Sequence, residues 1–193
     1  EQPLTETAVP YPSSPYAVSK LAAEYYVRTI GDLWEIETVS LRVFNAYGPG
    51  QRLPPSHPPV IPNFLKQTTR SGTLVMYGEG HQTRDYVFVD DVVNAMIAAS
   101  TAPDINNLVI NVGSGTEISI RELVKLIMEV TGVKAEVISN HQNDPGVLRM
   151  CADLSIARSK LGYKPHFSLS EGLRLTVERD SRFHPDSVTE STE

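Results

Sequence analysis

Apolar and polar positions recur along this chain with two periods, which predict strands and helices in turn. Residues 38–43 alternate with a period of two and are rich in β-branched side chains, which is typical of a strand. Residues 108–112 form a nearly continuous apolar run, which indicates a strand buried on both faces. Residues 15–30 instead repeat apolar side chains every three or four positions, which predicts an amphipathic helix ended by Gly31.

Further elements follow the same two patterns. The sequence predicts helices at about residues 61–70, 90–100, 119–131, 153–161 and 168–183, and shorter strands at 74–77, 85–89 and 135–138. Capping boxes are expected at the start of two helices, and aspartate caps at the start of two others: Ser119 with Glu122, Ser168 with Glu171, Asp90 and Asp153. Because strands alternate with helices, we expect an α/β fold with a largely parallel sheet.

Composition limits the expected binding partners of the protein and its expected cellular compartment. The 193 residues carry a net charge of −6 and no run of Lys or Arg, so neither nucleic acid nor an acidic membrane is an expected partner. The single cysteine, Cys151, excludes an internal disulfide, suits a reducing cytoplasm and is expected to be an inert core thiol. The five histidines are scattered without ligand spacing, so no metal site is predicted.

The first candidate for chemistry is the pair Tyr16 and Lys20. Ser14 can cap the helix that begins at Pro15, and the four-residue spacing then places the two side chains on one face. A tyrosine phenol titrates near ~10, and a fixed ammonium nearby favours the phenolate. The pair can therefore move a proton to and from a substrate hydroxyl. The competing interpretation is a surface helix with an unrelated tyrosine and lysine.

One turn is a candidate phosphate loop. Residues 113–115 (GSG) follow a predicted strand and precede a predicted helix, which is where dinucleotide-binding folds place their glycine-rich turn. The turn has no third glycine in register, and no acidic residue ends a following strand. It is therefore expected to be a tight connection between a strand and a helix.

Four motifs in this order, with segments 77–80 and 83–92 counted together, resemble the extended short-chain dehydrogenase/reductase family, and within it the NAD-dependent nucleotide-sugar epimerases and dehydratases. The matching segments are 16–20 (YAVSK), 41–49 (LRVFNAYGP), 77–80 (YGEG), 83–92 (TRDYVFVDDV), and 111–115 (NVGSG) with Ser119 and Glu122. The resemblance covers about residues 3–180, and it implies the carboxy-terminal part of a Rossmann-type sheet plus a smaller α/β substrate-binding lobe.

The resemblance also implies a division of the chain. Residues 1–50 would carry a late Rossmann helix and strand, residues 51–183 the substrate-binding lobe with a returning Rossmann strand and helices, and residues 184–193 a disordered tail. The amino-terminal Rossmann half, with its glycine-rich loop and a catalytic Ser or Thr, would be a missing partner. On its own the chain is then expected neither to bind NAD tightly nor to turn over substrate, and to expose the apolar strands 41–44 and 108–112.

In such a family member, Tyr16 would be the general base and acid, and Lys20 would support it and bind the nicotinamide ribose. Val43 and Phe44 would line the nicotinamide of NAD, and Asn45, at the end of a strand, would hydrogen-bond the nucleotide-sugar. A turn-forming Asn is the competing interpretation. Arg42 is expected to pair with a helix or a strand edge.

Other residues of the resemblance concern the nucleotide. Arg84 and Arg149 would converge on the substrate diphosphate, because a guanidinium is a planar, permanently charged donor. Asp153 would contact the ribose, and Tyr77 would pack against the base. The competing interpretations are ordinary ion pairs for the arginines and a core position for Tyr77.

The function implied by the resemblance is NAD-dependent epimerisation, at C4 of a UDP-hexose, through a transient 4-keto sugar. UDP-glucuronate decarboxylases and nucleotide-sugar 4,6-dehydratases share the first oxidation and stay open as alternatives. A further alternative is an inactive module that only binds nucleotide-sugar or dimerises. A cytoplasmic homodimer is expected, formed through the helix at residues 15–30, whose small and aromatic side chains suit close helix packing.

Overall fold

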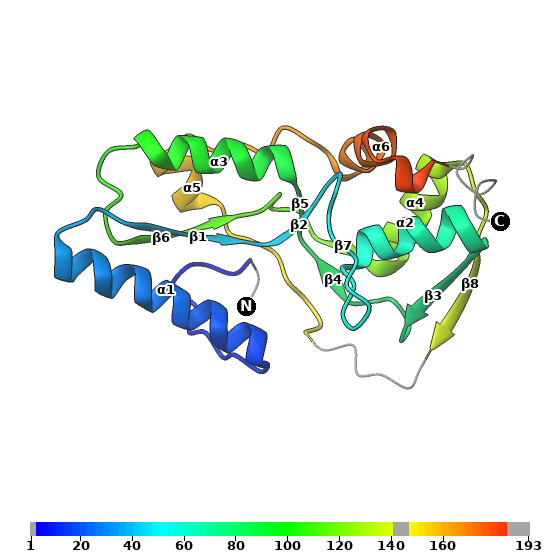
Figure 1. Cartoon of the computed structure of the whole chain (residues 1–193), viewed down its shortest axis with the longest axis horizontal. Coiled ribbons are helices and arrows are strands. Elements are labelled where there is room, and N and C mark those ends of the chain that lie inside the picture. The colour runs from blue at the N-terminus through cyan, green and yellow to red at the C-terminus, as the bar shows by residue number, and fades with distance from the viewer. Residues whose placement is uncertain (1–2, 141–146, 185–193) are drawn as a thin grey trace, which may run out of the picture.

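The computed structural model describes residues 3–140 and 147–184 and confirms an α/β fold with parallel strand pairs. Figure 1 shows two parts joined near the middle of the molecule, where β2 and β5 lie. The loop expected at residues 140–146 and the tail expected at 184–193 lie outside the described residues, except that Asn140 ends a strand and His184 follows a short helix.

The first part is built on β1 (Val39–Val43) and β6 (Leu108–Val112), which pair in parallel. Helices α3 (Val89–Thr101) and α5 (Ser155–Leu161) lie on one side of this pair and α1 (Pro15–Trp34) lies on the other (Figure 1). Ile110 and Val112 are fully buried on one face of β6, and Asn111 is 2% exposed on the other, so the end of this strand is covered on both faces.

The second part has a separate apolar core between helices and short strands. Its elements are β2 (Asn45–Tyr47), α2 (Val60–Ser71), β3 (Thr73–Tyr77), β4 (Thr83–Arg84), β5 (Tyr86–Phe88), β7 (Ile118–Ser119), α4 (Ile120–Thr131), β8 (Glu136–Asn140), α6 (Leu169–Arg179) and the 3₁₀ helix η1 (Ser181–Phe183). Strand β2 pairs in parallel with β5, and β3 with β8, whereas β4 and β7 pair in antiparallel. The fully buried Phe88, Leu123 and Phe183 belong to its core.

The end of α1 differs from the prediction. The helix runs through Gly31 and ends at Trp34, and its C-cap Glu35 adopts φ 54°. Gly31 is the only residue of α1 that is buried, and a Cβ there would lie 2.7 Å from Cγ2 of Thr38. The glycine therefore permits a close approach between the helix and the start of β1 and does not stop the helix.

Helix starts agree with the sequence only in part. The capping box of Ser119 and Glu122 is confirmed, because each residue's side chain accepts from the other's backbone N–H. The expected cap by Asp90 is wrong: α3 begins one residue earlier, at Val89, and Asp90 pairs with Arg179 at 3.2 Å. Helix α6 also ends earlier than predicted, at Arg179, and residues 181–183 continue as η1.

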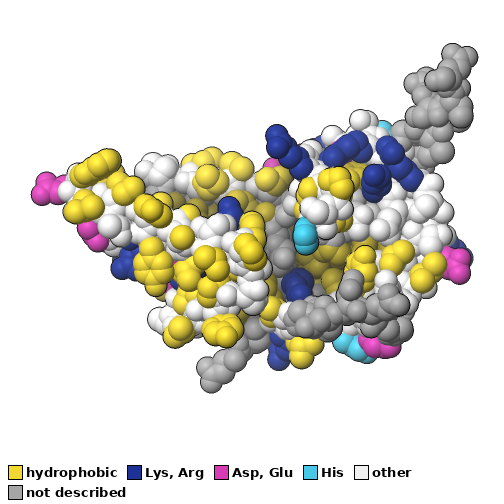
Figure 2. All heavy atoms as spheres, turned by 60° about the horizontal axis from the view of Figure 1, so that its bottom comes forward, with side chains coloured by type: hydrophobic (Ala, Val, Ile, Leu, Met, Phe, Trp, Pro, Cys, Tyr) yellow, Lys and Arg dark blue, Asp and Glu magenta, His cyan; other side chains and the backbone are white. Residues whose placement is uncertain are grey.

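Exposed apolar side chains lie mostly on helices, although Val43 of β1, Tyr77 of β3, and Val137 and Ile138 of β8 are also exposed. The strand at 108–112, expected to lie bare, is covered, whereas α1 leaves Tyr26 and Trp34 at 69% and 70% exposure. Helix α3 exposes a second stripe, including Met96 and Ile97. Figure 2 shows apolar side chains gathered over the part of the surface that contains α1.

Among the described residues, no helix is both long and apolar enough to cross a bilayer. The same residues contain no cluster of three or more His, Cys, Asp or Glu side chains that could hold a metal ion.

Candidate active site

A cleft of about 420 Å³ opens where the two parts meet. Five segments form its wall: the first turn of α1, the chain from the end of β1 through β2, the loop after β2, the first turn of α2, and the beginning of β5. The lining residues are Tyr16, Val43, Phe44, Asn45, Ala46, Tyr47, Gln51, Pro59, Val60, Ile61, Pro62 and Tyr86. The structure thus brings four of the sequence-predicted residues together, namely Tyr16, Val43, Phe44 and Asn45.

Tyr16 projects from the beginning of α1. The Ser14 hydroxyl accepts from the Ala17 N–H at 3.2 Å, which fixes the first turn, and Pro15 has no N–H to lose there. The Tyr16 side chain is 71% exposed, and Nζ of Lys20 lies 5.5 Å from its ring centroid. The two side chains therefore share one helix face beside the cleft.

Arg42 ties α1 to the sheet, as expected of a helix-pairing residue. Its guanidinium donates to both carboxylate oxygens of Glu24, at 2.9 and 2.8 Å, and to the Glu6 carbonyl at 3.1 Å. The hydrogen bonds to Glu24 raise the pKa of Arg42. Because α1 buries so little apolar surface, this bidentate pair and Gly31 hold the helix that carries Tyr16.

Asn45 begins the strand β2, although the sequence pattern placed it at the end of a strand. Its backbone N–H and its side-chain Nδ2 both donate to the Asp85 carbonyl, at 3.1 and 3.0 Å. Its Nδ2 also lies 3.7 Å from the sulfur of Met150. The side chain is therefore fixed at the junction of β2 with β5, on the cleft wall.

The carboxylate of Asp85 is fully buried and accepts four hydrogen bonds. Oδ1 accepts from the backbone and the hydroxyl of Ser114, both at 2.7 Å, and Oδ2 accepts from Gly115 N and Ala152 N, both at 3.0 Å. The backbone N–H groups of Ser114 and Gly115 in the 113–115 turn therefore already donate to Asp85. The turn serves as a structural connection, and it is not a phosphate loop.

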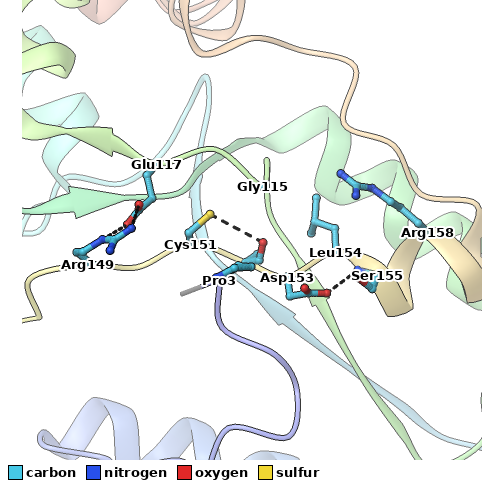
Figure 3. Close-up of a pocket in the computed structure, with 10 residues that line it drawn as sticks. Pro3, Gly115, Glu117, Arg149, Cys151, Asp153, Leu154, Ser155 and Arg158 are labelled. Carbon is cyan, nitrogen blue, oxygen red and sulfur yellow. Dashed lines mark hydrogen bonds and ion pairs between the residues drawn. The ribbon is translucent and has the colours of Figure 1, made fainter. Parts of the chain in front are cut away.

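A second, smaller cleft of about 270 Å³ lies beyond this carboxylate and contains Arg149 and Asp153 (Figure 3). Arg149 makes a 2.6 Å ion pair with Glu117 across its edge. Asp153 accepts from Ser155 N at 2.8 Å, and the hydrogen bonds from Ser155 lower the pKa of Asp153. Burial raises the pKa of the Cys151 thiol to about 11, which agrees with an unreactive cysteine.

Arg84 lines neither of these two clefts. Its guanidinium donates to the carbonyls of Val147 and Thr83, at 2.6 and 2.7 Å. The Thr83 hydroxyl donates at 2.7 Å to Glu117, the partner of Arg149. Both arginines are therefore anchored to one network, but they do not line a common cavity. Tyr77, at 47% exposure, occupies the end of β3 and is not a core tyrosine.

Sequence reasoning missed the first turn of α2. Pro59 precedes the helix, and no side chain caps its first amides. Val60, Ile61 and Pro62 of this turn line the larger cleft. The positive end of the helix dipole thus faces the cleft and suits an anionic group. The proline before the helix was a visible signal, but the sequence alone could not place this helix end opposite Tyr16.

Comparisons with known proteins agree with the family that the motifs resemble. The family model described as the NAD dependent epimerase/dehydratase family matches residues 1–113. The UDP-glucose 4-epimerase of Mycolicibacterium smegmatis is 35% identical over 176 residues, which cover 91% of this chain and 56% of that protein.

Solved structures agree with the fold. The UDP-glucose 4-epimerase of Thermotoga maritima with UDP-glucose superposes with a TM-score of 0.83 at 35% identity, covering 92% of this chain and 56% of that one. A mutant UDP-glucuronic acid 4-epimerase from Bacillus cereus, in complex with UDP-4-deoxy-4-fluoro-glucuronic acid and NAD, gives 0.82 at 30% identity, covering 91% and 55%. The chain therefore spans about half the length of the relatives it matches.

Proposed function

Because the chain belongs to the NAD-dependent epimerase/dehydratase family, we propose that it carries the substrate site and proton-transfer pair of a nucleotide-sugar 4-epimerase that acts on a UDP-hexose. The observation that carries the proposal is the shared cleft of Tyr16, Asn45 and the first turn of α2. The relatives named for UDP-sugar 4-epimerases support the substrate class.

In this proposal Tyr16 moves the proton. Its hydroxyl stands at the mouth of the cleft, where it takes the proton from the C4 hydroxyl of the sugar and later returns it. Lys20, 5.5 Å from the ring centroid, stabilises the negative charge on the phenolic oxygen while the proton is away. Asn45, with its side chain fixed by the Asp85 carbonyl, orients the sugar in the cleft.

The cleft wall beside Tyr16 fits the nicotinamide end of NAD. Val43 and Phe44 offer an apolar surface for a flat ring, and the ammonium of Lys20 suits the adjacent ribose hydroxyls. NAD, when bound, supplies the hydride acceptor. Since the 113–115 turn is occupied by Asp85, we propose that a dinucleotide-binding half outside these 193 residues holds the pyrophosphate. The greater length of the relatives supports this division.

The nucleotide would extend from the larger cleft across the hydrogen-bonded network that anchors Arg84 and Arg149. We assign the diphosphate to the first turn of α2 and to Arg84 and Arg149, which would have to turn toward it from their present acceptors, and we assign the ribose to Asp153 and the base to Tyr77. Arg149 would exchange Glu117 for the diphosphate. The present ion pair costs little to break, because the Arg149 side chain is 61% exposed and water screens the attraction.

Calorimetric titration of the chain with UDP-glucose tests the proposal. We expect binding, and we expect Arg84→Ala to weaken it about tenfold or more, since a charge-assisted contact to the diphosphate is lost. Arg70→Ala, an exposed change at the far end of α2, is the matched control and should leave the affinity unchanged. A wild-type chain that binds no UDP-glucose, alone or with its dinucleotide-binding half, would refute the proposal.

We also propose a homodimer that buries the exposed face of α1. Tyr25, Tyr26, Leu33 and Trp34 are 57–71% exposed, and a second copy is the partner that would cover such a stripe on both molecules by symmetry. Sedimentation velocity should show a dimer for the wild type and a monomer for Tyr26→Glu. Ser56→Glu, in an exposed loop away from α1, should stay dimeric. A wild-type protein that sediments as a monomer at every concentration would exclude this assembly.

A further inference from the structure

Three tyrosines are almost completely buried: Tyr47, Tyr86 and Tyr163, at 3%, 4% and 5% exposure. Burial raises the pKa of each phenol, so all three keep their O–H at neutral pH. Tyr47 donates to the Leu169 carbonyl at 3.3 Å, and Tyr163 donates to the Gly113 carbonyl at 2.9 Å. The hydroxyl of Tyr86 has no hydrogen-bond partner in the structure.

The position of Tyr86 suggests why its hydroxyl has no hydrogen-bond partner within the protein. Tyr86 lies in β5 directly opposite Asn45 of β2, and both side chains line the cleft that contains Tyr16. A buried donor without an acceptor is costly to a fold, and such a group at a cleft commonly finds its partner in a bound molecule.

A complementary acceptor lies in the same wall. Nε2 of Gln51 donates to the Ala46 carbonyl at 3.1 Å, whereas its Oε1 is shielded from solvent and also has no partner. The loop that carries Gln51 is held from the other side, because Asp180 accepts from Gly50 N at 2.8 Å and Arg182 donates to the Gln51 carbonyl at 3.0 Å. Within residues 3–140 and 147–184, Thr68 of α2 is the one other buried side chain with an unpartnered atom, and it does not line the cleft.

A donor and an acceptor that line one cleft suit a ligand group that both donates and accepts. A sugar hydroxyl can accept from Tyr86 and donate to Gln51, whereas a phosphate accepts only and would leave Gln51 unsatisfied. We propose that Tyr86 and Gln51 bind hydroxyls of the sugar ring and so select the sugar; this assignment rests on the proposed function. Because both atoms are shielded in the ligand-free cleft, the wall must shift slightly when the sugar enters.

Tyr86→Phe separates this role from a structural one. The change removes only the unpartnered oxygen, so the melting temperature of the ligand-free protein should stay the same or rise. The affinity for UDP-glucose should fall about five- to tenfold, while the affinity for UDP, which has no sugar ring, should be unchanged. Gln51→Met should likewise lower the affinity for UDP-glucose and leave the affinity for UDP unchanged.

Tyr163→Phe is the matched control, because it removes a buried hydroxyl that is hydrogen-bonded. It should lower the melting temperature and leave the affinity for UDP-glucose unchanged. Equal binding of UDP-glucose by wild type and Tyr86→Phe, or an equal loss for UDP and UDP-glucose, would overturn the assignment. A wild type that binds neither UDP nor UDP-glucose would instead refute the proposed function.

Discussion

Tyr16→Phe should lower kcat of epimerisation by about 10²–10⁴-fold, the usual contribution of a positioned general base. The assay uses this chain together with its dinucleotide-binding half and NAD. The phenyl ring keeps its place on the cleft wall beside Lys20, so KM for the nucleotide-sugar should change little. A fall in kcat at constant KM would identify the lost oxygen as part of the transition state rather than of substrate binding.

Tyr25→Phe provides the comparison on the same helix. Tyr25 is 57% exposed and does not line the cleft, so its hydroxyl should be irrelevant to turnover. Retention of wild-type kcat by Tyr16→Phe would rule out the proton-transfer role, whatever the effect of Tyr25→Phe.

Asp85→Asn should destabilise the fold by about 3 kcal/mol or more, the largest effect on stability that we expect. The amide keeps the shape of the carboxylate but has one acceptor oxygen, so its NH₂ faces backbone N–H groups that now lack an acceptor. If the one remaining oxygen faces Ser114, the backbone N–H groups of Gly115 and Ala152 have no hydrogen-bond acceptor. Urea unfolding, with an unchanged dependence on urea concentration, measures the loss.

Glu178→Gln is the matched control for a lost carboxylate charge. Glu178 pairs with Arg174 one turn away on the exposed face of α6, and such pairs contribute only about 0.2–0.5 kcal/mol. If Asp85→Asn lowered the free energy of unfolding no more than Glu178→Gln does, the four hydrogen bonds at Asp85 would not be what stabilises the chain between the two clefts.

Local patterns predicted much of this fold. The alternation at 38–43 and the apolar run at 108–112 identified β1 and β6, and the Ser119–Glu122 pattern identified the start of α4. Cap chemistry at Ser14 and Pro15 placed Tyr16 at the beginning of α1. These features depend on residues within a few positions of one another, which is the range that sequence periodicity and capping can describe.

Features that depend on distant segments were not predictable. Asp85 looks like the first residue of a strand, and its role appears only when residues 113–115 and 152 close around it. Gly31 looks like a helix stop until Thr38 is seen against it. The ion pair of Arg149 with Glu117 likewise joins segments 32 residues apart, so the sequence could suggest the arginine's charge but not its present partner.

Proton NMR tests the proposed 4-epimerisation most directly. UDP-glucose is incubated with NAD and with this chain joined to its dinucleotide-binding half, and the products are read from the spectrum. We predict UDP-galactose as the only new nucleotide-sugar, since oxidation of C4 followed by reduction from its other face inverts that carbon alone. A spectrum without UDP-galactose, or one that shows a 4-keto-6-deoxy sugar formed by loss of water, would contradict the assignment of this cleft to 4-epimerisation.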